Sequence, residues 1–323
     1  MQRILITGAA GQIGTELAPA LLDRYAGATV VATDIKEPGA QPEDVAFQRL
    51  DCTDRQACER AVADHEVDTI YHLAAILSAN AEGIPQKAWD VNMTGLFNIL
   101  ETAREHGCAV FTPSSIAAFG PDTPADPTPQ DTLQRPSTMY GVTKVAGELL
   151  CDYYADRMDV DARGLRYPGL ISYTAPPGGG TTDYAVEIFH AALRDGRYTC
   201  YLEPDTQLDM MYMPDALRAA MELMDADPGV LRHRNAFNIT AMQLTPARLA
   251  DAIRRHLPEF EMGYDVDPVR QRIAESWPRR LDDSAAREEW GWKPEYDIDA
   301  MVADMLMNLA PRLGITAPVG QAR

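Results

Sequence analysis

The sequence offers little for a structural metal or a disulfide framework. Five cysteines are scattered through the 323 residues without a CxxC pair or a Cys/His cluster: Cys52, Cys58, Cys108, Cys151 and Cys200. Reduced thiols are the simplest interpretation, so we expect a cytoplasmic protein that binds no metal. Long apolar runs are missing too, since none approaches the ~20 residues that span a bilayer. Strand-like sequence begins by Arg3, which leaves no room for a signal peptide.

Positive charge is also scarce. The chain has 29 Lys and Arg against 48 Asp and Glu, which gives a net charge of −19 and a pI near 4.6. A field of that sign repels phosphate backbones, so we expect no nucleic-acid partner and, without an apolar span, no membrane partner. A hydrophobic content of 46% is ordinary for a soluble globular chain of one large or two smaller domains.

The most informative stretch that is present is a glycine turn near the start of the chain. The apolar run at 3–7 leads directly into Gly8-Ala-Ala-Gly11-Gln-Ile-Gly14, and a helical pattern follows. Glycines allow a tight turn and a close backbone approach, so the pyrophosphate of a dinucleotide can rest on the helix N-terminus. The GxxGxxG spacing differs from GxGxxG, and a βαβ turn that binds nothing is the alternative.

A carboxylate ends the second predicted strand. The apolar run at 29–33 is followed by Asp34, 20 residues past Gly14. Such a carboxylate accepts hydrogen bonds from both adenosine ribose hydroxyls and repels a 2′-phosphate, which favours NAD over NADP. Lys36 argues in the other direction, although we expect it to be a solvated turn lysine.

Strands and helices alternate through the first half of the chain. Buried strands are predicted at 68–75, 109–115 and 162–169, and a long helix from about 87 to 105. This order predicts an α/β fold with a doubly wound parallel Rossmann sheet.

After residue 170 the alternation of strand and helix breaks, and helices are predicted at 244–256 and 299–309. We therefore expect a smaller, mostly C-terminal substrate lobe beside the NAD-binding domain. The expected NAD-binding domain covers 1–170 and is re-entered around 205–243, and the lobe covers 171–204 and 244–323.

One predicted helix carries the candidate chemistry. Tyr140 and Lys144 would lie one turn apart on one face of it. An ammonium ~4 Å from a phenolate at an effective dielectric of ~20 contributes ~4 kcal/mol, enough to bring the phenol pKa from ~10 toward neutrality. Tyr140 could then serve as a general base. Chance is the alternative, because the chain has 13 Tyr and four Lys. A hydroxyl partner is predicted at the end of the 109–115 strand, at Ser114 or Ser115.

A loop rich in proline and glycine opens the second half of the chain. Residues 172–183 contain two prolines and three glycines, followed by Thr181, Thr182 and Asp183. Hydroxyls and backbone N–H groups at a helix start make a receptor for a small carboxylate. The alternative is a loop that ends in an ordinary helix cap.

The order of glycine turn, Asp34, Ser115, Tyr140 and Lys144 resembles that of extended short-chain dehydrogenase/reductases, and the resemblance covers nearly the whole chain. More specific stretches make it similar to the short-chain, epimerase-like, metal-independent L-threonine 3-dehydrogenases. These stretches are Leu-Ala-Ala-Ile-Leu-Ser78, Arg166-Tyr-Pro-Gly-Leu-Ile-Ser172, Pro-Pro-Gly-Gly-Gly-Thr-Thr-Asp-Tyr184, Met210-Met-Tyr-Met-Pro-Asp215 and Ser276-Trp-Pro-Arg-Arg-Leu-Asp-Asp283. Ser-Ile-Ala-Ala-Phe-Gly at 115–120 departs from the more usual Ser-x-x-Val-Tyr-Gly.

The resemblance implies roles for individual residues. The implied catalytic set is Ser115, Tyr140 and Lys144. Substrate would contact Ser78, Ser115, Tyr140, Gly180, Thr181, Thr182, Asp183 and Trp277. The cofactor would contact Gly8, Gly11, Gln12, Ile13, Gly14, Asp34, Asp51, Cys52, Leu73, Ala74, Ala75, Asn92, Tyr140, Lys144 and Tyr167.

Residues alone leave three of these roles open. The 51–54 stretch could instead cap the helix beginning near Arg55. Asn92 could be a polar residue in helix packing, and Trp277 a core tryptophan.

The implied reaction is NAD-dependent oxidation of the L-threonine 3-hydroxyl to 2-amino-3-oxobutanoate, a step of threonine catabolism. A homodimer through helices 87–105 and 140–155 is implied by the same family. Two alternatives share the fold: a nucleotide-sugar epimerase or dehydratase, and a non-catalytic NAD-binding sensor.

Overall fold

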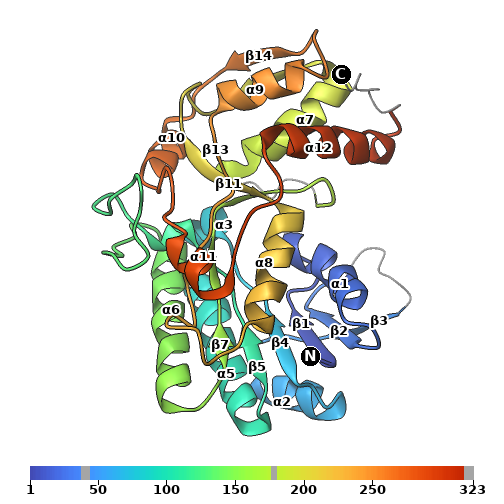
Figure 1. Ribbon diagram of the computed structural model, residues 1–323, viewed down its shortest axis with the longest axis vertical. Coiled ribbons are helices and arrows are strands. Elements are labelled where there is room, and N and C mark those ends of the chain that lie inside the picture. The colour runs from blue at the N-terminus through green and yellow to red at the C-terminus, as the bar shows by residue number, and fades with distance from the viewer. Residues whose placement is uncertain (38–43, 176–179, 316–323) are drawn as a thin grey trace.

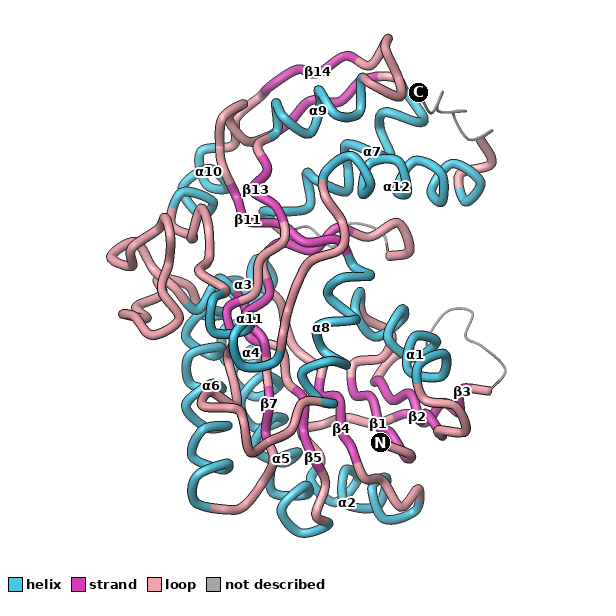
Figure 2. Tube along the Cα trace, viewed as in Figure 1, coloured by secondary structure: helices cyan, strands magenta, loops and turns pink. Residues whose placement is uncertain are grey.

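The computed structural model describes residues 1–37, 44–175 and 180–315. Figure 1 shows a parallel sheet with helices on both sides in the lower half of the molecule and a smaller group of helices and strands above it. Figure 2 shows that the strands of the lower half run side by side.

Six parallel strands form the central sheet, in the order β3-β2-β1-β4-β5-β7. Their bounds are β1 Arg3–Thr7, β2 Thr29–Asp34, β3 Val45–Arg49, β4 Thr69–His72, β5 Ala109–Phe111 and β7 Ala162–Arg163. The order reverses between β1 and β4, where open α/β sheets bind their ligands. The predicted α/β class with a parallel Rossmann sheet is therefore confirmed.

Successive side chains of β1 point to opposite faces of the sheet and pack into two different hydrophobic clusters. Ile4 and Ile6 pack with α1 (Gln12–Arg24) and α8 (Met213–Asp225) on one face. Leu5 packs on the other face with α2 (Arg55–Asp64), α5 (Gly95–His106) and α6 (Met139–Arg157). A continuous apolar run is thus explained by burial on both faces.

The smaller upper part surrounds a third hydrophobic cluster. A three-stranded sheet, β13-β11-β9, lies beside a two-stranded one, β10-β14. The strands are β9 Gly169–Ile171, β10 Arg197–Cys200, β11 Leu208–Tyr212, β13 Met242–Leu244 and β14 Glu261–Tyr264. The helices are α7 Tyr184–Asp195, α9 Pro246–Arg254, α10 Pro268–Glu275 and α12 Ile298–Arg312.

Part of the 205–243 stretch returns to the lower half. Helix α8 packs against α1 (Figure 1), and Arg24 forms an ion pair with Asp225 at 2.7 Å. Strand β12 (Phe237–Asn238) pairs with β8 (Leu165–Tyr167), which also pairs with β6 (Ser114–Ser115). Helix α11 (Ser284–Trp290) contacts β12.

The long helix predicted from about 87 to 105 is interrupted. It consists of α4 (Pro85–Trp89), a π-helical turn at Asp90–Thr94, and α5, and it ends at Gly107 with a φ of 71°. A π turn inserts one extra residue and often marks a functional site. Here it carries Asn92.

None of the helices among the described residues is both long and apolar enough to cross a membrane. The five cysteines are buried and unpaired by disulfide. Within the same residues, no group of three or more His, Cys, Asp or Glu side chains is placed to hold a metal ion.

The glycine turn sets up a stability test. Gly8 has a φ of +72°, and a Cβ there would lie 2.6 Å from the Ala74 backbone nitrogen. Gly27 has a φ of +82° but open space around it. Gly27→Ala should therefore cost only the left-handed backbone term of about 1–2 kcal/mol, whereas Gly8→Ala should cost clearly more, because the β4 loop must move. Urea unfolding measures both, and equal losses would contradict this account of the turn.

Candidate active site

A cleft of about 680 Å³ opens at the carboxyl edge of the central sheet. That volume lies within the ~300–1,000 Å³ typical of ligand sites. The cleft brings together most of the residues singled out from the sequence: Gly8, Gly11, Gln12, Ile13, Gly14, Leu73, Ala75, Ser78, Ser115, Tyr140, Lys144, Tyr167, Gly180, Thr181, Thr182, Asp183 and Trp277.

The glycine turn leaves a cradle at one end of this cleft. Gly11 is the N-cap of α1 and provides no capping side chain. A Cβ at Gly14 would lie 2.6 Å from the Ala9 Cα, so the turn tolerates no bulk. Backbone N–H groups at a helix start without a cap attract an anion. The cradle therefore fits the pyrophosphate of a dinucleotide.

Asp34 lies behind the turn rather than on the cleft wall. Its two carboxylate oxygens accept hydrogen bonds from the backbone N–H of Ala10 at 3.1 Å and of Lys36 at 3.0 Å. The Lys36 side chain is exposed and lines the cleft. The carboxylate thus fixes the backbone of the turn at Ala10.

Four other predicted cofactor residues also stand apart from the cleft lining: Asp51, Cys52, Ala74 and Asn92. Asp51 accepts two hydrogen bonds from Thr53, and Asp54 caps α2 by accepting from the Ala57 N–H at 3.0 Å. The capping role for the 51–54 stretch is therefore observed. Cys52 is buried, and burial raises the pKa of its thiol to about 12.

Asn92 joins two walls of the cleft. Its Oδ1 accepts from the Ile76 N–H at 2.7 Å, and its Nδ2 donates to the Ile76 carbonyl and to the Thr143 Oγ1, both at 3.1 Å. Ile76 follows β4, and Thr143 lies between Tyr140 and Lys144 on α6. The buried amide therefore fixes the Tyr140 helix against the loop that follows β4.

Tyr140 and Lys144 lie on the first turns of α6, which is capped by Thr138 accepting from the Gly141 N–H at 3.0 Å. Both side chains line the cleft, and the Lys144 Nζ lies 5.3 Å from the Tyr140 ring centroid. The Lys144 ammonium donates a 2.6 Å hydrogen bond to the Pro113 carbonyl. It therefore lies over the ring face and beside the end of β5.

The expected lowering of the Tyr140 pKa is not present in the protein by itself. Burial raises the pKa of Tyr140 to about 12, and a hydrogen bond from Ser115 only partly offsets this. Burial likewise lowers the pKa of Lys144 to about 8, against the opposing effect of the Glu148 carboxylate. The lowering expected from Coulomb's law is not seen in this state because that argument left out desolvation, which is the largest effect on the pKa of each group.

The two adjacent serines are separated by their partners. Ser114 donates a short hydrogen bond to Glu148, whereas the Ser115 Oγ accepts from the Ala117 N–H at 3.2 Å and bonds the Tyr140 hydroxyl. Both line the cleft, but only Ser115 is bonded to Tyr140.

A short 3-10 turn, η3 (Thr181–Asp183), forms the opposite wall with Trp277. The Gly180 N–H donates to Asp183 at 2.8 Å, so that amide is already used. The Tyr201 hydroxyl lies 3.2 Å from the Gly180 carbonyl and 3.3 Å from the Thr181 carbonyl, to which it donates. Residues 176–179 of the predicted carboxylate receptor lie outside the described residues.

Several contributors were not found from the sequence. Pro113 and Thr174 line the cleft, and Tyr201 holds the Thr181 segment from outside the lining; none of the three stands in a recognisable motif. Tyr167 lines the cleft as expected, but its hydroxyl donates to the Ala216 carbonyl at 2.7 Å. Tyr167 therefore offers the cleft only its ring.

A parallel α/β sheet with a glycine turn and a Tyr/Lys pair at its carboxyl edge defines the class of short-chain dehydrogenase/reductases. The chain belongs to the NAD dependent epimerase/dehydratase family, whose model matches residues 4–239. The family resemblance seen in the sequence is thereby confirmed.

Known proteins resemble the chain over almost its full length. An uncharacterized epimerase/dehydratase of Staphylococcus saprophyticus is 52% identical over 95% of this chain and 96% of that protein. The structure of L-threonine dehydrogenase from Clostridium difficile has a TM-score of 0.95 at 54% identity, covering 98% of this chain and 99% of that one. A monomeric L-threonine 3-dehydrogenase from a metagenome has a TM-score of 0.91 at 46% identity, covering 96% and 99%.

Asn92→Ala tests the joint between the two cleft walls. Losing the amide leaves the partly buried Ile76 N–H without its side-chain partner, so the free energy of unfolding should fall by about 1 kcal/mol or more. Asn80→Ala is the control, because Asn80 is exposed on the rim of the same cleft and should change stability by no more than ~0.5 kcal/mol. If the Asn92 variant is as stable as the control, the joint is unimportant.

Proposed function

We propose that this protein oxidises the 3-hydroxyl of L-threonine to 2-amino-3-oxobutanoate with NAD as the acceptor. The observation that carries the proposal is the single cleft in which the glycine turn, Ser115, Tyr140, Lys144 and the Thr181–Asp183 turn face one another. The similarity to an L-threonine dehydrogenase structure at 54% identity supports this substrate.

NAD is the proposed cofactor because the family is NAD dependent and the glycine cradle admits a pyrophosphate. Gly8, Gly11, Gln12, Ile13 and Gly14 would hold it, with Asp34 on the ribose side. When bound, the nicotinamide accepts the hydride from the substrate C3.

The protein's own residues would handle the proton. Ser115 would orient the 3-hydroxyl, and the Tyr140 oxygen would accept its proton as the C3–H electron pair leaves. Because burial opposes the phenolate, Tyr140 needs positive charge nearby. Lys144, with a pKa near 8, carries that charge at neutral pH.

The substrate would lie between the two parts of the molecule. Ser78, Gly180, Thr181, Thr182, Asp183 and Trp277 would bind the amino and carboxyl groups. We propose accordingly that residues 1–170, with the return at 205–243, form the NAD-binding domain, and that 171–204 and 244–323 form the substrate lobe.

The homodimer, the cytoplasmic location and the role in threonine catabolism stay predictions. Exposed apolar side chains on α4, α5 and α6, among them Trp89, Phe97, Leu149 and Tyr153, mark the face where a partner would pack. One solved relative is described as monomeric, so sedimentation of the purified chain decides this point.

Incubation of the purified protein with L-threonine and NAD should produce NADH, measured by its absorbance. Tyr140→Phe should retain NAD binding while turnover falls roughly 10²-fold or more, because the proton acceptor is lost. NADP should work less well, since the Asp34 carboxylate repels a 2′-phosphate.

Three results would count against the proposal. Activity only with a nucleotide sugar would indicate an epimerase or dehydratase. NAD binding without any turnover would indicate a non-catalytic sensor. Near-normal turnover in Tyr140→Phe would remove Tyr140 from its role. Equal efficiency with NADP would overturn the Asp34 argument alone.

Tyr201→Phe tests how the Thr181 segment is held. Without the hydroxyl, the Gly180 and Thr181 carbonyls lose a donor, so KM for L-threonine should rise several-fold with kcat and NAD affinity nearly unchanged. Tyr198→Phe is the matched control on the same edge, because its hydroxyl donates to Glu187 at 2.7 Å instead. The role fails if both variants show the same KM.

A further inference from the structure

Lys144 is a half-buried lysine on the wall of the large cleft, and the small cavity described below also borders it. Its ammonium donates to the Pro113 carbonyl, and within the described residues it forms no ion pair with a carboxylate. Burial therefore lowers the pKa of Lys144, and among the residues that the structure describes no carboxylate in direct contact offsets this effect. Something nearby has to favour the charged form if Lys144 is to stay an ammonium near neutral pH.

Glu148 lies one turn further along α6, so it shares a helix face with Lys144. Its side chain is only 4% exposed. Arg166 holds both carboxylate oxygens, at 3.0 and 2.8 Å, while Ser114 donates to one oxygen and Gln134 to the other at 2.6 Å. Charge-assisted hydrogen bonds of this kind hold a buried carboxylate firmly in one position.

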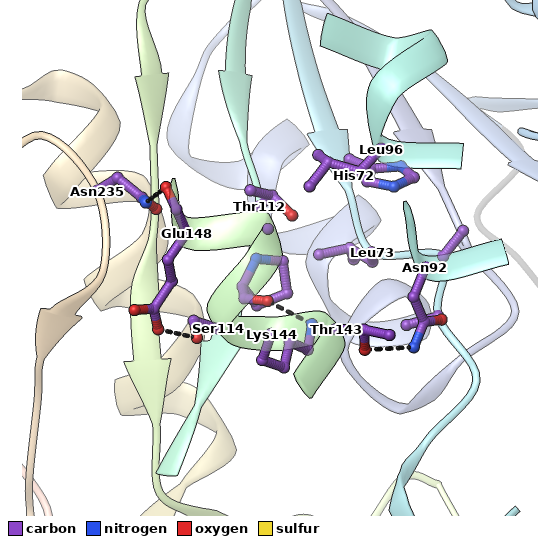
Figure 3. Close-up of a pocket in the computed structure, with 14 residues that line it drawn as sticks. His72, Leu73, Asn92, Leu96, Thr112, Ser114, Thr143, Lys144, Glu148 and Asn235 are labelled. Carbon is purple, nitrogen blue, oxygen red and sulfur yellow. Dashed lines mark hydrogen bonds between the residues drawn. The ribbon is translucent and has the colours of Figure 1, made fainter. Parts of the chain in front are cut away.

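A second, small cavity connects the two charges. Its volume is about 30 Å³, enough for a water molecule. Figure 3 shows Lys144 and Glu148 on its wall together with Asn92 and Asn235.

Arg166 does not line this cavity but a separate one of about 420 Å³, which Glu148 also lines. Its remaining N–H groups point to the Gln130 carbonyl and the Asn238 side chain. Glu148 is therefore shared by the cavity that Lys144 lines and the cavity that Arg166 lines.

The other ionisable groups around Lys144 do not substitute for Glu148. His72 on β4 is buried and its pKa is lowered to about 3, so it is neutral. Cys151 on α6 is buried, and its pKa is raised, so it is a neutral thiol. Tyr140 is a neutral phenol for the same reason.

Asp152 is next to Cys151 on α6 and bonds Asn235. Of the described residues, Glu148 is the carboxylate that lines the small cavity.

We propose that Glu148 is a positioning residue that keeps Lys144 charged from across the small cavity, with Arg166 and Ser114 holding the carboxylate in place. The inference deepens the proposed function, since it names the group that prepares Lys144 for its role beside Tyr140. Its physical part is independent of which substrate the cleft takes.

The test follows the Lys144 side chain directly. The chain contains only four lysines, at 36, 87, 144 and 293, so their Nζ signals can be followed by NMR of the full ¹⁵N-lysine-labelled protein over a pH series. In Glu148→Gln, the midpoint of the Lys144 titration should move about one unit to lower pH. Glu148→Asp keeps the negative charge, so its Lys144 midpoint should lie close to that of the unaltered protein. If Glu148→Gln does not fold, Glu148→Asp still tests the point, because the shorter side chain should shift the midpoint slightly to lower pH.

Asp161→Asn is the control for merely breaking a buried arginine pair, because Asp161 binds Arg163 at 2.7 Å on neighbouring β7. That variant should lose stability without moving the Lys144 midpoint. A folded Glu148→Gln protein with an unchanged midpoint would overturn the proposal and leave Glu148 as a structural anchor.

Kinetics adds a second readout. If L-threonine is the substrate, the alkaline loss of NADH formation should begin at lower pH in Glu148→Gln than in the unaltered protein. No turnover in either protein would contradict the proposed function, while the NMR midpoint would still decide the role of Glu148.

Discussion

The proposed chemistry depends on one half-buried ammonium, that of Lys144 on the cleft wall. In the proposed mechanism Lys144 lies close to Tyr140 to favour a phenolate, yet burial also disfavours the charge of Lys144 itself. The Pro113 carbonyl satisfies one of its donors, and the Glu148 carboxylate acts on it through space. Two effects therefore oppose each other at this lysine. Desolvation strengthens its electrostatic interactions with neighbouring groups, but it also lowers the pKa of the lysine and so favours loss of the proton.

The architecture around this charge serves to hold α6 in place. Parallel strands deliver their carboxyl ends to one edge, which puts the glycine turn, the loop after β4 and Ser115 next to the same helix. The π turn carries Asn92 to the junction between that loop and Thr143. On the far wall, Tyr201 holds the carbonyls of Gly180 and Thr181. On each side of the cleft a polar side chain, the buried Asn92 or the half-buried Tyr201, thus fixes backbone groups.

The sequence predicted those features that depend on local pattern. The glycine turn, the strand that ends at Asp34, and the one-turn spacing of Tyr140 and Lys144 follow from residue type and periodicity alone, and the parallel fold follows from their order. Other features could not be predicted from a local pattern: the π turn, the bonds of Asn92, the Glu148–Arg166 pair and the Tyr201 contact. The three contacts join residues that are distant in the sequence. The predicted lowering of the Tyr140 pKa is not seen in this state, because burial raises it, and burial depends on the fold and not on the Tyr-x3-Lys spacing.

The central claim is that the cleft removes a hydride from C3 of L-threonine. The most direct measurement uses L-threonine deuterated at C3, with mass spectrometry of the cofactor after turnover. One deuterium in the recovered NADH is the predicted result. NADH that contains no deuterium, or NAD that stays oxidised while the substrate is consumed, would contradict the account.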